Sequence, residues 1–209
     1  MTVRLAHQDV SDVVGYKRAG WWGDTTVGDY VARWAREQPD ADAFVVDDAR
    51  MSWFEYDARA TRLATALAAT KLPREARVAV LLPDGAAVHI AFVAAERAGL
   101  TVVGIGHRAG EAEIRHLLTK TAAAAIVVQE RDETRVPDDL GLTRVIVSAD
   151  GEGEPQAWGF DAGALDSRAF GADDLFLVNS TSGTTGLPKC VMHNQNRWMF
   201  FHQLAAAGT

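Results

Sequence analysis

The fold of this chain is decided by three short apolar runs, RVAVLL (Arg77–Leu82), TVVGI (Thr101–Ile105) and AAIVV (Ala124–Val128). Each run is rich in β-branched or aliphatic residues, which is typical of a buried strand. Two helical segments separate them, Gly85 to Ala98 and Glu111 to Thr121, and the first is almost entirely apolar. Strands that alternate with helices of this length predict βαβ units. We therefore expect an α/β fold with three layers around a mostly parallel sheet.

Two further helices are expected upstream of these runs. Thr26 with Asp29, and Ser52 with Glu55, each form a capping box, in which a hydroxyl residue precedes an acid by three positions. Apolar residues at helical spacing follow both boxes. The segment between the two helices, residues 43–47, is predicted to be a short strand.

Composition narrows the class of protein. The 209 residues suffice for one hydrophobic core, and the net charge of −7 argues against a nucleic-acid surface. The single cysteine, Cys190, excludes an internal disulfide framework and suits a reducing compartment. The longest apolar stretch, Ala86 to Ala95, is too short to span a bilayer. We expect a soluble, cytoplasmic protein without a transmembrane segment.

A stretch rich in glycine and acids, residues 149–172, divides the chain. We expect an N-terminal α/β subdomain over residues 1–148, a connecting loop over 149–172, and the start of a second subdomain over 173–209. Because the chain stops soon after this last unit begins, we expect it to be the N-terminal fragment of a longer protein.

One loop has the composition of a phosphate-binding site. It lies between an apolar strand-like run, Leu175 to Val178, and an extended run, Cys190 to His193. Glycines let the backbone turn and bring its N–H groups close to oxygen atoms, hydroxyls add neutral donors, and a lysine adds a positive charge. The loop reads Thr181-Ser182-Gly183-Thr184-Thr185-Gly186-Leu187-Pro188-Lys189.

Two other interpretations of this loop fit less well. A flexible Ser/Thr/Gly linker seldom lies between two strand-like runs. A Walker A loop requires G-x-x-x-x-G-K-[ST], whereas this spacing is G-x-x-G-x-x-K with no hydroxyl residue after Lys189. Pro188 also lacks an N–H, and strand formers follow where Walker A would begin a helix.

The run from Ser180 to Lys189 resembles, over all ten positions, the signature phosphate loop of the adenylate-forming superfamily. That family contains acyl-CoA synthetases, aryl-acid AMP ligases, peptide-synthetase adenylation domains and luciferases. Weaker similarity to the N-terminal half of these enzymes, particularly to the branches that activate aryl and cyclic acids, extends the resemblance over essentially the whole chain, although only the loop is a specific motif. It is carried by Trp21-Trp22, residues 26–29, residues 52–55, and residues 107–114.

The resemblance implies a two-step ligase. A carboxylic acid reacts with Mg-ATP to give an acyl-adenylate and pyrophosphate, and a thiol, most often that of CoA, then displaces AMP. Lys189 would be catalytic, because it would offset charge as pyrophosphate departs. The phosphates of ATP would be held by Thr181, Ser182, Gly183, Thr184, Thr185 and Gly186.

The implied partners are the small-molecule acid and the C-terminal part of the same enzyme. The protein ligand of Mg²⁺ would lie beyond residue 209, and homo-oligomerisation is left open. An aryl-acid AMP ligase that feeds a carrier protein is one alternative. A second, from another class, is a non-catalytic nucleotide-binding or interaction module.

The sequence departs from the family pattern just after the loop. Cys190 stands where glycine is usual, and Asn194-Gln195 stands where Thr-His is common, while His193 keeps an expected position. His193 and Trp198 are candidates for the acyl pocket or for support of the loop. We expect Trp198, Phe200 and Phe201 to face the core.

Other motifs carry less weight. The glycines between Gly104 and Gly110 follow a strand but have the wrong spacing for a dinucleotide fingerprint, so a glycine-rich turn is favoured over a nicotinamide enzyme. The histidines show no metal spacing, and no metal site is expected. Cys190 lacks an assignable partner for nucleophilic chemistry. Trp21 and Trp22 are expected to serve packing.

Overall fold

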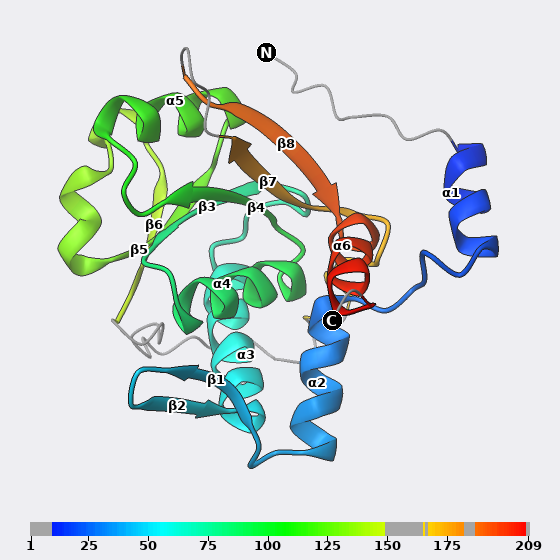
Figure 1. Ribbon diagram of the computed structural model, residues 1–209. Coiled ribbons are helices and arrows are strands. Elements are labelled where there is room, and N and C mark those ends of the chain that lie inside the picture. Colours follow the sequence, from blue (N-terminus) through cyan, green and yellow to red (C-terminus); the bar gives the residue numbers. More distant parts are fainter. Residues whose placement is uncertain (1–9, 149–164, 166, 182–186, 208–209) are drawn as a thin grey trace.

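The computed structural model describes residues 10–148, 165, 167–181 and 187–207. Helices and strands alternate through most of this range (Figure 1). In chain order they are α1 (Val10–Arg18), α2 (Val27–Glu37), β1 (Asp42–Val46), β2 (Ala49–Ser52), α3 (Trp53–Ala69), β3 (Arg77–Leu82), α4 (Ala86–Arg97), β4 (Thr101–Gly106), α5 (Glu111–Thr121), β5 (Ala125–Gln129), η1 (Glu130–Arg135), η2 (Asp138–Leu140), β6 (Thr143–Val147), β7 (Leu175–Thr181), β8 (Lys189–Asn194) and α6 (Gln195–Ala207).

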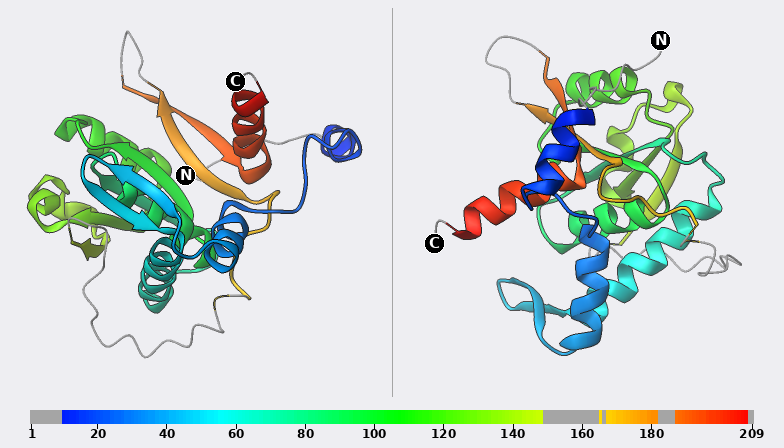
Figure 2. Two further views of the ribbon diagram at one scale, coloured as in Figure 1. Left: turned by 60° about the horizontal axis from the view of Figure 1, so that its bottom comes forward. Right: turned by 90° about the vertical axis from the view of Figure 1, so that its right-hand side faces the viewer.

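A six-stranded sheet forms the middle layer, with the strand order β6-β5-β3-β4-β7-β8. All neighbouring pairs are parallel except β7 and β8, which form an antiparallel hairpin at one edge. Helices α3 and α4 cover one face of the sheet and α5 covers the other (Figures 1 and 2). The predicted three-layer α/β fold with a mostly parallel sheet is therefore confirmed.

Strand β3 shows why the sheet needs cover on both faces. Val78 and Val80 pack into the core beneath α3 and α4, whereas Ala79 and Leu81 pack into the core beneath α5. Side chains alternate between the two faces of a strand, so an unbroken apolar run buries residues on both. All four residues are at most 1% exposed.

Helix α4 lies between the sheet and α3, and this position explains its apolar composition. Ile90, Ala91, Ala94 and Ala95 are fully buried. The predicted stripe of α3 packs against it, with Ala60, Leu63, Ala64 and Leu67 all at most 1% exposed. A helix covered on most sides cannot carry a polar face, which is the pattern that the sequence shows.

Both predicted capping boxes are present. Thr26 Oγ1 accepts a hydrogen bond from Asp29 N at 3.1 Å, and Asp29 Oδ2 accepts one from Thr26 N at 2.9 Å. Ser52 and Glu55 exchange the same pair of bonds at the start of α3. The side chains thereby satisfy backbone donors that the first turn of each helix leaves without an acceptor.

Two predictions about aromatic residues were partly wrong. Trp22 is buried against Tyr16, but Trp21 is 52% exposed. On α6, Phe201 is 58% exposed and does not face the core, and Trp198 is 37% exposed although its ring contacts Phe176. The physical reason is the position of α6, which leaves the sheet from its edge strand β8 and so has core on one side only (Figure 2).

Candidate phosphate-binding site

The predicted phosphate loop closes the hairpin between β7 and β8. The two strands pair from Leu175 and Asn194 to Thr181 and Lys189. Because β7 runs parallel to β4, the hairpin tip lies at the edge where the parallel strands have their carboxyl ends. Ligands of open α/β sheets bind at this edge. Ser182, Gly183, Thr184, Thr185 and Gly186 lie outside the described residues.

The two ends of the loop are well placed for a ligand. The Thr181 hydroxyl lies 3.5 Å from the carbonyl oxygen of Lys189, across the base of the loop. The Lys189 side chain is exposed, and it has no ion-pair partner in the part of the chain that the structure describes. Pro188 is buried beside it. A lysine that is anchored through its backbone and free at its ammonium group can reach an anion.

His193 and Trp198, proposed from the sequence for an acyl pocket, do lie together. Their rings meet edge to face with centroids 5.9 Å apart, and Phe176 meets Trp198 in the same way at 6.2 Å. His193 Nδ1 is buried and has no hydrogen-bond partner within the described residues. Burial, with a smaller effect of Arg197, lowers the pKa of His193, so the imidazole is neutral at pH 7. The result is an aromatic corner with one neutral polar atom.

Cys190 is accommodated because β8 is regular at that point. It lies opposite Ser180 with an extended backbone, so the position does not require a left-handed conformation. Burial raises the pKa of the thiol. A half-buried protonated thiol is a poor nucleophile, which agrees with the sequence-based interpretation.

Comparison with known proteins adds to this geometry. A family model described as "AMP-binding enzyme" matches residues 31–207.

The chain belongs to the AMP-binding enzyme family.

Curated AMP-binding relatives include a salicyl-AMP ligase / salicyl-S-ArCP synthetase of Mycobacterium tuberculosis (strain ATCC 25618 / H37Rv), 32% identical over 217 residues. The match covers 92% of this chain and 37% of the relative. A medium/long-chain-fatty-acid–CoA/3-oxocholest-4-en-26-oate–CoA ligase of the same strain is 28% identical over 168 residues, which is 74% of this chain and 30% of the relative. The chain thus spans between 30% and 37% of the length of these two relatives.

A solved structure supports the fold assignment. The N-terminal subdomain of Klebsiella oxytoca NpsA, in complex with 3-hydroxybenzoyl-AMSN, superposes with a TM-score of 0.64 at 21% identity. The match covers 81% of this chain and 41% of that one. The fold is therefore that of the N-terminal subdomain of adenylate-forming enzymes. No helix among the described residues is both long and apolar enough to cross a membrane.

Residues at the junction of β8 and α6 were not recognised as a site from the sequence. Asn194 caps α6, since its Oδ1 accepts a hydrogen bond from Arg197 N at 2.9 Å. The next two residues, Gln195 and Asn196, are also buried, at 0% and 5% exposure. The sequence carried a signal for this junction, namely three consecutive amide residues, 194–196, at the boundary between a strand and a helix. Amide side chains that are buried there must find hydrogen-bond partners.

Glu96, near the end of α4, is a second residue that sequence reasoning missed. Its side chain is buried, with 3% of the residue exposed, and Oε1 accepts hydrogen bonds from Thr26 Oγ1 at 2.6 Å and Gly28 N at 3.1 Å. Burial raises the pKa of this carboxyl although these donors act in the opposite direction. The Gln195 amide also lies close enough to lower that pKa, yet its Nε2 has no acceptor at hydrogen-bond distance in the described structure.

This buried carboxyl predicts a pH-dependent stability. The unfolded chain loses the Glu96 proton above about pH 4.3, whereas the folded protein keeps it to a higher pH because its pKa is raised. The free energy of unfolding therefore decreases as the pH rises through the pKa of Glu96 in the folded protein. Glu96→Gln keeps an oxygen for Thr26 and Gly28 and removes the charge. We expect the variant to unfold at higher urea concentration than the wild type at pH 8, with the advantage shrinking at pH 4.5.

Urea unfolding at both pH values measures this difference. Glu96→Ala serves as the control, because it removes the acceptor as well as the charge and should destabilise the protein at both pH values. A difference between Glu96→Gln and the wild type that does not change with pH would show that Glu96 does not titrate between the two states.

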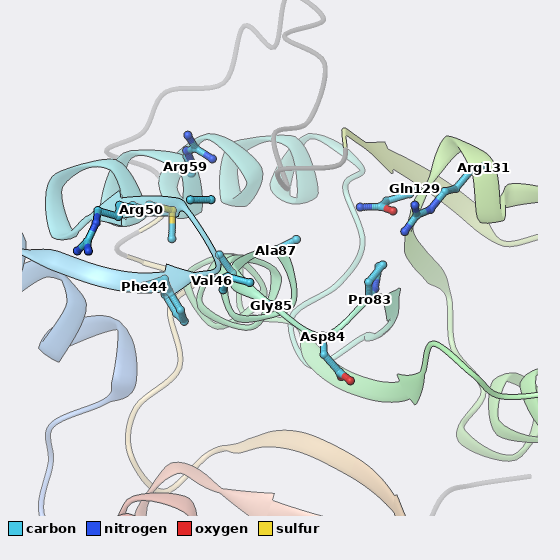
Figure 3. A pocket seen from close by; sticks show the side chains of 13 residues that line it. Phe44, Val46, Arg50, Arg59, Pro83, Asp84, Gly85, Ala87, Gln129 and Arg131 are labelled. Carbon is cyan, nitrogen blue, oxygen red and sulfur yellow. The ribbon is translucent and has the colours of Figure 1, made fainter.

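A hollow of about 400 Å³ lies further along the carboxyl edge, between the ends of β3 and β5 and the β1–β2 hairpin (Figure 3). Three arginines line it, Arg50, Arg59 and Arg131. They do not converge on one point, and Figure 3 shows their guanidinium groups directed to different sides. Arg50 pairs with Asp42, and Arg131 Nε lies 3.5 Å from a carboxylate oxygen of Asp132. We assign no ligand to this hollow.

Proposed function

We propose that the chain is the N-terminal part of an ATP-dependent ligase that activates a carboxylic acid as its acyl-adenylate and transfers the acyl group to a thiol. The observation that carries the proposal is the loop of hydroxyl residues and glycines at the hairpin tip, followed by exposed Lys189. It lies at the carboxyl edge of a parallel sheet in a member of the AMP-binding enzyme family.

The reaction consists of two displacements. A carboxylate oxygen of the acid attacks the α-phosphorus of ATP, and the bond to the bridging oxygen of the β-phosphate breaks, which releases pyrophosphate. A thiol sulfur then attacks the acyl carbon, the C–O bond to AMP breaks, and the thiol proton passes to solvent. The first step turns a poor electrophile into a good one, because AMP is a far better leaving group than oxide.

In this proposal the loop acts by position and charge. Hydroxyls and backbone N–H groups of residues 181–186 hold the β- and γ-phosphates, and Lys189 stabilises the negative charge that builds up on departing pyrophosphate. Mg²⁺ would arrive bound to the phosphates of ATP. The described residues contain no group of three His, Cys, Asp or Glu side chains that could hold it, so no step is assigned to a metal ligand of this chain.

CoA is the thiol that we propose. The fatty-acid–CoA ligase relative supports this choice, whereas the salicyl-AMP ligase / salicyl-S-ArCP synthetase, which matches more of the chain, supports an aryl acid passed to a carrier protein. Both alternatives share the adenylation step. They differ in the second displacement, which the hairpin does not determine.

Exchange of labelled pyrophosphate into ATP tests the adenylation step directly. The natural gene product should exchange pyrophosphate in the presence of at least one acid from a panel of fatty, aromatic and alicyclic acids. MgATP binding without exchange for any acid would favour a non-catalytic nucleotide-binding module, and failure to bind MgATP would contradict both alternatives.

The aromatic corner makes a prediction about substrate choice. If His193 lines the acyl pocket, its neutral imidazole recognises a polar substituent on the acid. We expect His193→Leu to lower kcat/KM about tenfold or more for hydroxylated acids relative to unsubstituted acids of the same size, since a lost hydrogen bond in a buried site costs at least that much. The KM for ATP should stay constant. An unchanged preference between the two acids would remove His193 from the pocket.

A further inference from the structure

The hairpin that carries the phosphate loop has a limited attachment to the sheet. Strand β8 lies at the edge of the sheet, so within the described part of the chain it pairs with β7 alone. Strand β7 pairs with β4 at two positions, Val102 with Leu177 and Val103 with Val178. The Thr101 hydroxyl adds one hydrogen bond to the Leu175 carbonyl at 3.0 Å. A hairpin attached over so short a distance needs further contacts to fix its orientation.

Asn196, two residues beyond β8, provides such contacts to the arm between α1 and α2. Its Oδ1 accepts a hydrogen bond from Gly23 N at 2.9 Å, and its Nδ2 donates to Gly23 O at 3.0 Å. Nδ2 also donates to Asp173 Oδ1 at 2.8 Å, and the Asn196 backbone N–H donates to Ala172 O at 3.1 Å. One buried amide thus joins the end of the hairpin to two segments that are distant in sequence.

Gln195 makes a parallel connection to the first turn of α2. Its Oε1 accepts a hydrogen bond from Val27 N at 3.0 Å, and the side chain is fully buried. The amide faces the Glu96 carboxyl, which in turn binds Thr26 Oγ1 and Gly28 N. The start of α2 is therefore held jointly by a residue of α6 and a residue of α4.

A lysine of α1 extends the network to the surface. Lys17 Nζ lies 2.7 Å from both Asp24 Oδ1 and Asp173 Oδ2. Asp173 also accepts the bond from Asn196, so it links α1 and the β8–α6 junction. Aromatic packing follows the same path, since the ring centroids of Trp21 and Phe200 lie 5.8 Å apart.

We infer that Gln195 and Asn196 are positioning residues that hold the phosphate-loop hairpin in place by tying the end of β8 to the segment 23–28. This inference rests on the proposed function for its catalytic consequence. Lys189 begins the strand that Asn194 ends, so a shift at the junction moves the whole of β8, and a misplacement of about 1 Å in a reacting group can cost roughly a hundredfold in rate.

The test combines hydrogen exchange and kinetics on the natural protein. In Asn196→Ala, the amides of β8 should exchange about tenfold faster or more than in the wild type, because lost buried hydrogen bonds ease local opening. Amides of β3 and β5 should keep their wild-type rates. In pyrophosphate exchange, kcat should fall about tenfold or more with little change in the KM for ATP, the pattern of a lost transition-state interaction.

A swapped pair separates positioning from mere stability. Gln195→Glu alone buries a second carboxylate beside Glu96, and it should lower kcat. The double variant, Gln195→Glu with Glu96→Gln, again has one amide and one carboxylate at this contact, with the two groups exchanged. It should regain most of the kcat that Gln195→Glu loses. Arg115→Ala is the matched control, because it removes an exposed ion pair between Arg115 of α5 and Asp139 of η2. It should change neither hydrogen exchange of the β8 amides nor kcat. If Asn196→Ala does not fold, Lys17→Met should show the same changes more weakly.

The outcomes are distinguishable. Unchanged exchange of the β8 amides in Asn196→Ala and Lys17→Met overturns the inference. Faster exchange with wild-type kcat also overturns the positioning role. A third outcome combines faster hydrogen exchange of the β8 amides in the variants with no pyrophosphate exchange by the wild type for any acid. It would support the structural role of Gln195 and Asn196 and contradict the proposed function.

Discussion

Lys189→Ala is expected to lower the rate of adenylation by the natural protein on the order of a hundredfold or more. A preorganised charge that stabilises a departing oxyanion is typically worth this much. The thermal midpoint should change little, because the side chain is exposed and has no ion-pair partner among the described residues. Steady-state pyrophosphate exchange and a melting curve measure the two quantities on the same preparation.

Lys120→Ala is the control for a general effect of charge. Lys120 is exposed at the end of α5, close enough to the base of the hairpin to influence the pKa of Cys190. Its removal changes the net charge by the same amount as Lys189→Ala but should leave the exchange rate near that of the wild type. Equal losses in the two variants, or wild-type exchange in Lys189→Ala, would remove Lys189 from the mechanism.

Gly99→Ala should cause the largest loss of stability among Gly→Ala substitutions at the glycines that the structure describes. Gly99 ends α4 with φ +67°, and its N–H bonds to Glu96 O while that of Leu100 bonds to Ala95 O, which is a Schellman arrangement. An added Cβ would lie 2.3 Å from the carbonyl oxygen of Arg168. Left-handed strain and backbone overlap together predict a loss of about 3 kcal/mol or more.

Gly141→Ala separates these two causes. Gly141 has φ +63°, but a Cβ added there would have no neighbouring atom within 4 Å. It should therefore lose only the conformational cost of about 1–2 kcal/mol. Urea unfolding of both variants gives the comparison. Similar losses at the two positions would mean that the segment around Arg168 moves away from α4 without cost.

The parallel sheet could be predicted from sequence because local and global preferences agree there. Arg77–Leu82 has the same bounds as predicted, and so does Glu111–Thr121. Both capping boxes formed because their geometry is local. Helix α1 and strand β2 were missed, since α1 has weak apolar periodicity and β2 has only four residues, so neither has a strong local pattern.

The candidate site was predictable to a smaller extent. The position of the loop between two strands followed from the apolar runs on either side, and the pairing of Thr181 with Lys189 is consistent with it. The roles of Glu96, Gln195 and Asn196 were not accessible, because each depends on a partner at least 68 residues away or on an element whose orientation the sequence does not reveal. Exposure of Phe201 was missed for the same reason.

A crystal structure of the natural protein with a non-hydrolysable ATP analogue tests the central claim most directly. The account predicts that the β- and γ-phosphates lie within hydrogen-bond distance of the backbone and hydroxyls between Thr181 and Gly186, with Lys189 Nζ directed at the triphosphate. A triphosphate bound elsewhere on the protein, with this loop making no contact to it, would contradict the account.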